Sequence, residues 1–216
     1  GRHAEAEPLF LRTLEIRRRV LGAAHPNTLG TTTNLGLCYN SLGRYQDAAA
    51  LLEISLPLKR RVLGMRHPWT SIATEGLATA YDQLGRRDEA LPLWRELLER
   101  MTSIADAPDA SAETLNKAAW VLLTHDNEAL LDPDRACGFA ERACMAAEAS
   151  GDANLWQYLD TLALAQHATG DTAAAIETQR RAIALMPSPD ADPGMHERLA
   201  EYEAALADSE RSDGGP

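Results

Sequence analysis

Apolar residues recur along most of the chain at steps of three and four residues, and glycine or proline interrupts this pattern at regular intervals. Such spacing places the apolar side chains on one face of a helix, so the pattern predicts a succession of helices and no strand. Pro26 and Pro68 suit the first turn of a helix, whereas Gly22 and Gly64 can adopt the left-handed conformation that ends one. The interruptions therefore divide the chain into helical hairpins.

An internal repeat of 42 residues organises these helices. Gly1, Gly43 and Gly85 occupy equivalent positions, and the segment RRVLGAAHPNT at 18–28 returns as RRVLGMRHPWT at 60–70. Repeats of this kind stack into solenoids in which each unit covers its neighbour.

Beyond residue 105 the period drifts, but the helical pattern continues to a final amphipathic segment that can cover the last repeat. We therefore predict an all-α fold, an α-solenoid of antiparallel helix pairs with about four repeat units. The predicted parts are the second helix of a truncated repeat (1–22), four repeats (23–64, 65–105, 106–150 and 151–187), a capping helix (193–209) and a disordered tail (210–216).

The charge and the hydropathy exclude several classes of protein. A net charge of -11 disfavours nucleic acid as a partner, because phosphates need a surplus of lysine and arginine. Neither an apolar run of about 20 residues nor a signal peptide is present, which predicts a cytoplasmic protein without a membrane partner. The cysteines, Cys38, Cys137 and Cys144, lie inside apolar helical patterns and are expected to be reduced thiols.

The sequence contains none of the catalytic or nucleotide-binding motifs H-E-x-x-H, G-x-S-x-G, G-x-x-x-x-G-K-[ST], H-R-D and D-F-G. We therefore predict a protein that is not an enzyme and that has no cofactor and no metal site. His25 and His67 occupy equivalent turns of successive repeats, which favours helix capping over metal binding. Cys137 and Cys144 lie two turns apart on one expected helix, about 10 Å, too far to share a metal.

The pattern G-R-Y-x-x-A, followed by R-V-L-G-x-x-H-P-x-T, resembles the 42-residue tetratricopeptide variant of kinesin light chains and many bacterial regulators over residues 1–105. Residues 158–187 resemble the terminal tetratricopeptide of large bacterial proteins, including serine/threonine kinases that carry such arrays. The resemblance implies a right-handed superhelix whose first helices line a concave groove for peptides or protein segments.

Matching this groove residue by residue gives a polar and rather acidic surface. Its expected members are Thr33, Asn34, Leu37, Asn40, Glu75, Thr79, Asp82, Glu113, Asn116, Lys117, Trp120, Gln157, Asp160, Thr161 and Leu164. The carboxylates favour a protein or peptide ligand with lysine or arginine over a ligand held by its terminal carboxylate. A solvated face without a ligand explains any single member as well, and Trp120 suits either a ligand anchor or the core.

Two functions of different kinds fit this sequence. The first is a non-catalytic interaction scaffold that binds a partner segment in its groove. The alternative is a structural or regulatory arm of a larger bacterial enzyme, such as a serine/threonine kinase, that contacts its own catalytic domain or mediates oligomerisation. Leu9, Leu14 and Val20 form an apolar stripe at an uncovered edge, which predicts either further repeats upstream or self-association through that edge.

Overall fold

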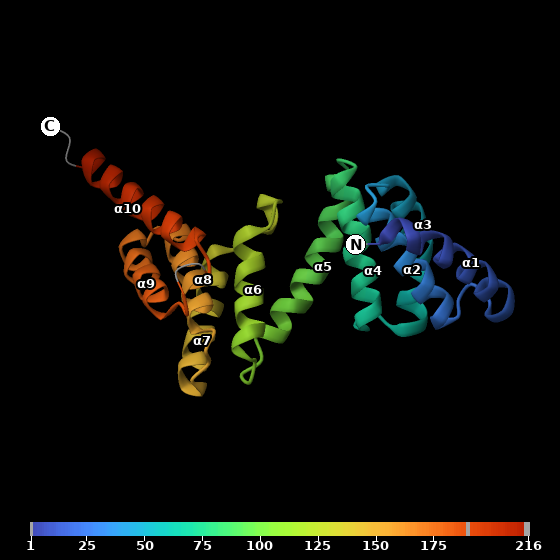
Figure 1. Cartoon of the computed structure of the whole chain (residues 1–216), viewed down its shortest axis with the longest axis horizontal. Helices are drawn as coiled ribbons and strands as arrows, with labels where there is room; N and C mark the ends of the chain where they lie inside the picture. Colours follow the sequence, from blue (N-terminus) through green and yellow to red (C-terminus); the bar gives the residue numbers. More distant parts are fainter. Residues whose placement is uncertain (1, 189–190, 214–216) are drawn as a thin grey trace. The chain divides into compact units, whose positions relative to one another are not determined.

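The computed structural model describes residues 2–188 and 191–213, and within these it contains ten α-helices, one 3-10 helix and no strand (Figure 1). The α-helices are α1 (His3–Leu21), α2 (Pro26–Ser41), α3 (Tyr45–Leu63), α4 (Pro68–Gln83), α5 (Arg87–Ala105), α6 (Ala112–Thr124), α7 (Pro133–Ser150), α8 (Leu155–Ala168), α9 (Thr172–Leu185) and α10 (Gly194–Asp213). Helices α1 to α4 pack side by side in chain order, as do α6 to α10, which confirms the all-α solenoid. None of the described helices is both long and apolar enough to cross a membrane.

The helices form two compact units, Gly1–Arg100 and Met101–Pro216. In the first unit, α2 packs against both α1 and α3, and α3 packs in turn against α4. Leu35, Leu52, Leu56 and Leu77 are buried in its core. Gly36 allows the close approach of α2 and α3, because a Cβ atom there would lie 2.8 Å from Cγ of Leu52.

Histidine side chains cap the N-termini of α2 and α4, as the sequence predicts. Nδ1 of His25 accepts a hydrogen bond from the backbone N–H of Asn27 at 3.2 Å, and Nδ1 of His67 accepts one from that of Trp69 at 3.1 Å. Each imidazole therefore satisfies a backbone donor that the first helical turn leaves free. The capping role of both histidines is confirmed.

An arginine clamp recurs with the repeat. The guanidinium of Arg44 lies 4.3 Å from the ring centroid of Tyr39 and forms an ion pair with Glu7 at 2.6 Å. Arg86 repeats this arrangement over Tyr81, at 4.2 Å, and pairs with Glu53 at 3.2 Å. Each clamp joins a first helix to the second helix of the preceding repeat.

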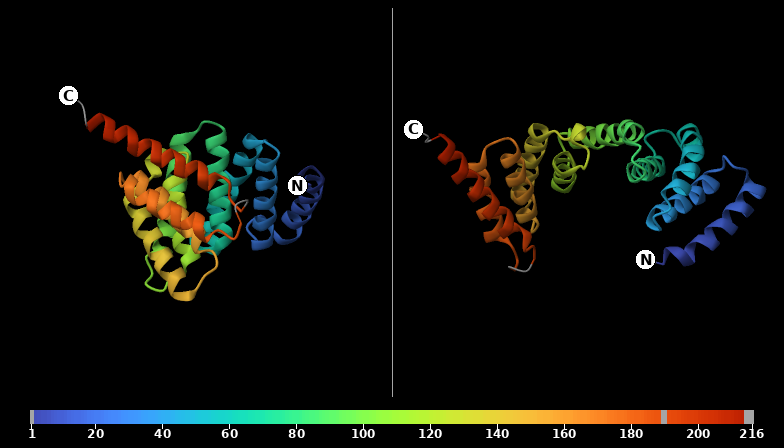
Figure 2. Two further views of the ribbon diagram at one scale, coloured as in Figure 1. Left: turned by 60° about the vertical axis from the view of Figure 1, so that its left-hand side comes forward. Right: turned by 90° about the horizontal axis from the view of Figure 1, so that it is seen from above.

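The second unit contains α6 to α10. Neighbouring helices pack in the order α6–α7, α7–α8 and α8–α9, and Figure 2 shows α10 alongside α9. A 3-10 helix at Glu128–Leu130 precedes α7 and was not predicted. The expected disordered tail was wrong for residues 210–213, which continue α10, and residues 214–216 lie outside the described residues.

Candidate functional site

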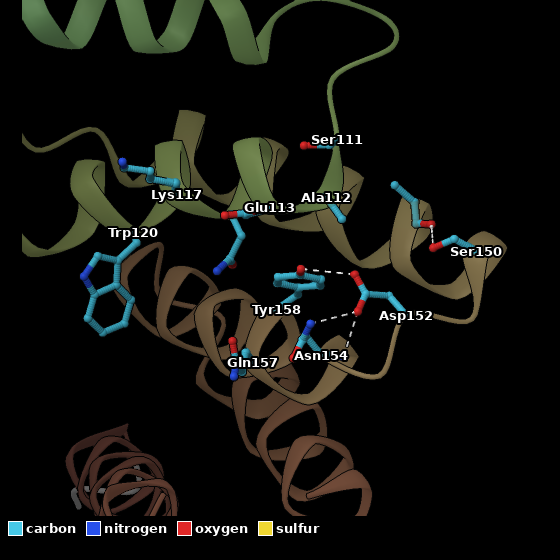
Figure 3. Close-up of a pocket in the computed structure, with 12 residues that line it drawn as sticks. Ser111, Ala112, Glu113, Lys117, Trp120, Ser150, Asp152, Asn154, Gln157 and Tyr158 are labelled. Atoms are coloured by element: carbon cyan, nitrogen blue, oxygen red, sulfur yellow. Dashed lines mark hydrogen bonds between the residues drawn. The ribbon is translucent and has the colours of Figure 1, made fainter. Parts of the chain in front are cut away.

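A cleft of about 800 Å³ lies in the second unit between α6, the end of α7 and the start of α8 (Figure 3). Its lining residues are Ser111, Ala112, Glu113, Asn116, Lys117, Trp120, Ala146, Ser150, Asp152, Asn154, Gln157 and Tyr158. We call this the α6–α8 cleft. Glu113, Asn116, Lys117, Trp120 and Gln157 are all residues that the sequence assigns to the groove, so the structure brings these five together.

Helical spacing explains how α6 presents its share of the cleft. The Ser111 hydroxyl caps the helix by accepting a hydrogen bond from the backbone N–H of Thr114 at 3.3 Å. Residues 113, 116, 117 and 120 then follow at steps of three and four, which places them on one face. Figure 3 shows Lys117 and Trp120 on α6 and Gln157 on α8 around the same space.

An acidic turn before α8 completes the cleft. The Asp152 carboxylate accepts hydrogen bonds from the backbone N–H of Asn154 at 2.9 Å and from the hydroxyl of Tyr158 at 3.2 Å. Burial raises the pKa of Tyr158, and the nearby charge of Asp152 adds to this effect. Three donors therefore hold Asp152 in place, including Nδ2 of Asn154 at 3.1 Å. Sequence reasoning missed this residue, although an aspartate two residues before an asparagine at a helix start is a recognisable turn pattern.

The cleft combines an aromatic surface with polar side chains. The Trp120 side chain is 43% exposed. Oδ1 of Asn116 is buried and accepts no hydrogen bond from the described residues. Glu113 and Asp152 outnumber Lys117, so the charge of the lining is acidic.

Three of the predicted groove residues are not available for a ligand. Thr33 is 3% exposed and its hydroxyl donates to the Leu29 carbonyl oxygen at 3.0 Å, while Thr161 is 2% exposed and donates to the Gln157 carbonyl oxygen at 3.2 Å. Asp160 is 7% exposed and forms an ion pair with Arg198 on α10. We therefore remove these three from the proposed groove.

Of the other predicted residues, Leu164 is half-buried on α8 in the second unit, and the rest, including half-buried Leu37, lie in the first unit. Nδ2 of Asn40 donates to the Gly76 carbonyl oxygen at 2.7 Å and so joins α2 to α4. The Asp82 carboxylate accepts a hydrogen bond from Nε1 of Trp94 at 2.6 Å, which also makes its role structural. Asn34 and Glu75 are exposed, and Thr79 is half-buried. Among the described residues, no three His, Cys, Asp or Glu side chains come together as a metal site.

Comparisons with known proteins agree with this architecture. Models of the tetratricopeptide repeat match residues 1–60, 29–103 and 157–189, together more than half of the chain. No curated protein matches it. The nearly identical TPR-like repeats of a kinesin light chain-type protein from Podosopora anserina match with a TM-score of 0.64 and 22% identity, over 86% of this chain and 87% of that one.

Two further solved structures show the same likeness of fold. A single-residue variant of the Podosopora anserina repeats has a TM-score of 0.62 at 21% identity, over 86% of this chain and 87% of that one. BtubC (BKLC) from P. vanneervenii has a TM-score of 0.59 at 23% identity, over 86% of this chain and 73% of that one. With the repeat models and the paired helices, these matches show that the chain belongs to the tetratricopeptide repeat family, with the fold of kinesin light chain-like arrays.

Proposed function

We propose that this chain is a non-catalytic scaffold that binds a segment of a partner protein in the α6–α8 cleft. Tetratricopeptide folds generally mediate protein–protein interaction. The observation that carries the proposal is the exposed indole of Trp120 in a cleft that the side chains of Asn116 and Gln157 also line. An apolar anchor surface next to side-chain amides, which can both donate and accept hydrogen bonds, is what an extended segment needs for affinity and register.

The charge of the cleft favours a partner segment that carries lysine or arginine. Glu113 is exposed at the rim, and Asp152 is held in place by its three donors. A cation near these carboxylates gains from electrostatic complementarity, which acts mainly on association rate and specificity. A side chain packed on Trp120 supplies most of the affinity, because tryptophan is enriched among residues that cost about 2 kcal/mol or more when truncated at interfaces.

A displayed library of random peptides, selected against the purified chain, tests this proposal. Selected peptides are then measured by fluorescence anisotropy against the parent chain and against Trp120→Ala and Glu113→Lys. We expect at least about a tenfold loss of affinity with Trp120→Ala, the equivalent of about 1.4 kcal/mol. Glu113→Lys should lower the affinity of peptides that carry lysine or arginine more than the affinity of uncharged peptides.

Matched controls come from the exposed face of α7 in the same unit. Met145 is 68% exposed, and Glu141 is exposed outside the cleft. Met145→Ala and Glu141→Lys therefore repeat the loss of an apolar side chain and the change of charge without touching the lining. Peptides that bind both cleft variants as tightly as the parent chain would rule out the α6–α8 cleft as the binding site.

Self-association through α1 is a second candidate function. Leu9, Ile16 and Val20 follow one stripe of α1 and are 68%, 45% and 68% exposed. Leu14, which the sequence analysis placed in this stripe, is buried in the core. The repeat equivalents on α3 are Leu51 and Leu58, which are half-buried, and Val62, which is 41% exposed. Leu9 and Ile16 are therefore more exposed than their equivalents, which favours a contact with a second copy. Sedimentation velocity over a range of concentrations tests this, and a parent chain that stays monomeric, with the same sedimentation as Val20→Glu, would exclude it.

A further inference from the structure

A second and smaller pocket, of about 210 Å³, lies in the first unit among α1, α2, α3 and α4. The charged residues that line it are Arg17 and Lys59, and no acidic residue is among its lining. This is unusual in a chain whose net charge is -11. We call it the Lys59 pocket.

Lys59 is buried without a counter-charge. It is 1% exposed, and its Nζ donates to the Trp69 carbonyl oxygen at 2.9 Å. An ammonium group has three donors, and no carboxylate of the described residues pairs with it. Burial lowers the pKa of Lys59 to about 8. A buried cation with one neutral acceptor is an incomplete arrangement, because buried charges are ordinarily paired.

Arg17 brings a second cation to the same pocket. Its Nη1 donates to the Asn27 carbonyl oxygen at 3.0 Å and to the Thr31 hydroxyl at 2.6 Å. Arg17 and Asn27 precede Lys59 and Trp69 by one repeat length, so the contact to the backbone carbonyl belongs to the repeat architecture. That architecture uses one of the three N–H donors of Lys59 and the Nη1 of Arg17. It does not account for a pocket whose two charged lining residues are both cations.

The surroundings of the pocket also favour an anion. Asn27 and Trp69 lie in the first turns of α2 and α4, where the helix dipole is positive. Trp69 and Ile72 are 45% and 41% exposed and form an apolar part of the lining. We infer that the Lys59 pocket binds a carboxylate group, held by the ammonium of Lys59 and the guanidinium of Arg17.

The Lys59 pocket is separate from the α6–α8 cleft, because it lies in the other unit and has the opposite charge. Either binding proposal can therefore be refuted while the other stands. Two sources can supply a carboxylate: the acidic side chain of a partner protein or a small free acid. A partner segment would also place an apolar side chain on Trp69 and Ile72. A free acid would not use that surface, and this difference separates the two sources.

The chain contains only two lysines, Lys59 and Lys117, which makes a direct test simple. Lysine labelled with carbon-13 at the ε position gives one side-chain signal for each of the two residues in a heteronuclear NMR spectrum, with exposed Lys117 as the internal control. Sodium acetate is titrated at constant ionic strength adjusted with sodium chloride. We expect a saturable shift of the Lys59 signal, little change at Lys117, and a rise of about one unit in the pKa of Lys59 at saturation, because a nearby anion favours the charged form.

Variants and peptides complete the design. Arg17→Gln should weaken acetate binding at least about fivefold, whereas Arg18→Gln, an exposed neighbour outside the pocket, should leave it unchanged. Affinity should fall as the pH is raised from about 7 to about 10, since Lys59 loses its proton over that range. No charged residue other than Arg17 lines the pocket beside Lys59.

Peptides with the sequence Leu-Glu-Leu, blocked at both ends, identify the source of the carboxylate, with Leu-Gln-Leu as the uncharged control. Tighter binding of the glutamate peptide than of acetate would assign the pocket to an acidic protein segment, and equal binding would assign it to free carboxylates. Absence of a saturable Lys59 shift with both acetate and the glutamate peptide would overturn the inference. So would an equal shift in the Arg17→Gln variant.

Discussion

A buried ion pair attaches α10 to the rest of the second unit. Nε and Nη2 of Arg198 donate to the two carboxylate oxygens of Asp160 at 3.0 and 2.8 Å. Nε2 of Gln179, which is fully buried, donates to the same carboxylate at 2.8 Å and to the Met195 carbonyl oxygen at 3.2 Å. The pair therefore joins α8, α9 and α10 through one carboxylate.

Replacing Arg198 with methionine should destabilise the second unit strongly. The Asp160 side chain is 10% exposed and would keep its charge with Gln179 as its remaining donor. Removing one partner of a buried pair costs about 3–5 kcal/mol. Because the Arg198 side chain is 25% exposed, we expect the low end, about 3 kcal/mol. Asp160→Asn in the same chain removes the stranded charge and should recover about 1–2 kcal/mol.

The control pair joins two of the same helices. Arg180 on α9 pairs with Glu203 on α10 at 2.6 Å, with side chains 61% and 46% exposed. Arg180→Met should cost less than about 0.5 kcal/mol, because exposed pairs contribute little. Urea unfolding followed by circular dichroism gives the free energies, and hydrogen exchange along α10 shows whether that helix opens first. Equal costs for Arg198→Met and Arg180→Met, or no recovery with Asp160→Asn, would refute this account of the Asp160–Arg198 ion pair.

Three further predictions follow from local contacts. His67→Ala should lower the free energy of unfolding in urea by about 1 kcal/mol, because it removes the cap of α4. His67→Asp keeps an acceptor at this position and should cost less. Equal losses would refute the capping role. Gly138→Ala should raise the free energy of unfolding by about 0.5–1 kcal/mol, because nothing lies within 4 Å of the new Cβ. Gly36→Ala should lower it by about 1 kcal/mol, because the new Cβ would meet fully buried Leu52. A change of the same sign at both sites in urea unfolding would contradict this account of the packing. Burial raises the pKa of Cys144 to about 12, whereas Cys137 is half-buried. Alkylation of the native chain near pH 8 should therefore modify Cys137 before Cys144. Equal rates of modification by mass spectrometry would refute this order.

The repeat explains why much of the fold could be predicted from the sequence. Helix faces, the proline and histidine starts of α2 and α4, and the close approach at Gly36 are local properties, and the period reports them twice. The last helix was harder to delimit. Its polar end carries no apolar stripe, yet α10 continues to Asp213.

The candidate site was predictable for the cleft face of α6 and for Gln157 on α8. The α6 residues of the cleft follow from helical spacing, because a single face presents them. The sequence analysis placed Asp160 in the groove, whereas the structure pairs it with Arg198, 38 residues away. No sequence pattern predicts a contact over that separation. Arg17 and Lys59 were overlooked because they lie on second helices, which the family resemblance does not assign to a groove.

The first two repeats and the third differ at one position in a way that separates packing from recognition. Arg17 and Lys59 occupy equivalent positions of the repeat, and the next equivalent, at the end of α5, is Met101. The helix forms there without a cation, so the repeat architecture does not by itself require one. A cation that packing does not demand, buried without a counter-charge, is better explained by a ligand. The α6–α8 cleft carries Glu113 and Asp152 instead, so the pocket of the first unit is cationic and the cleft of the second is acidic. The ligand chemistry of each pocket therefore depends on a few charged side chains, while the apolar stripes of the repeat maintain the helix packing in both.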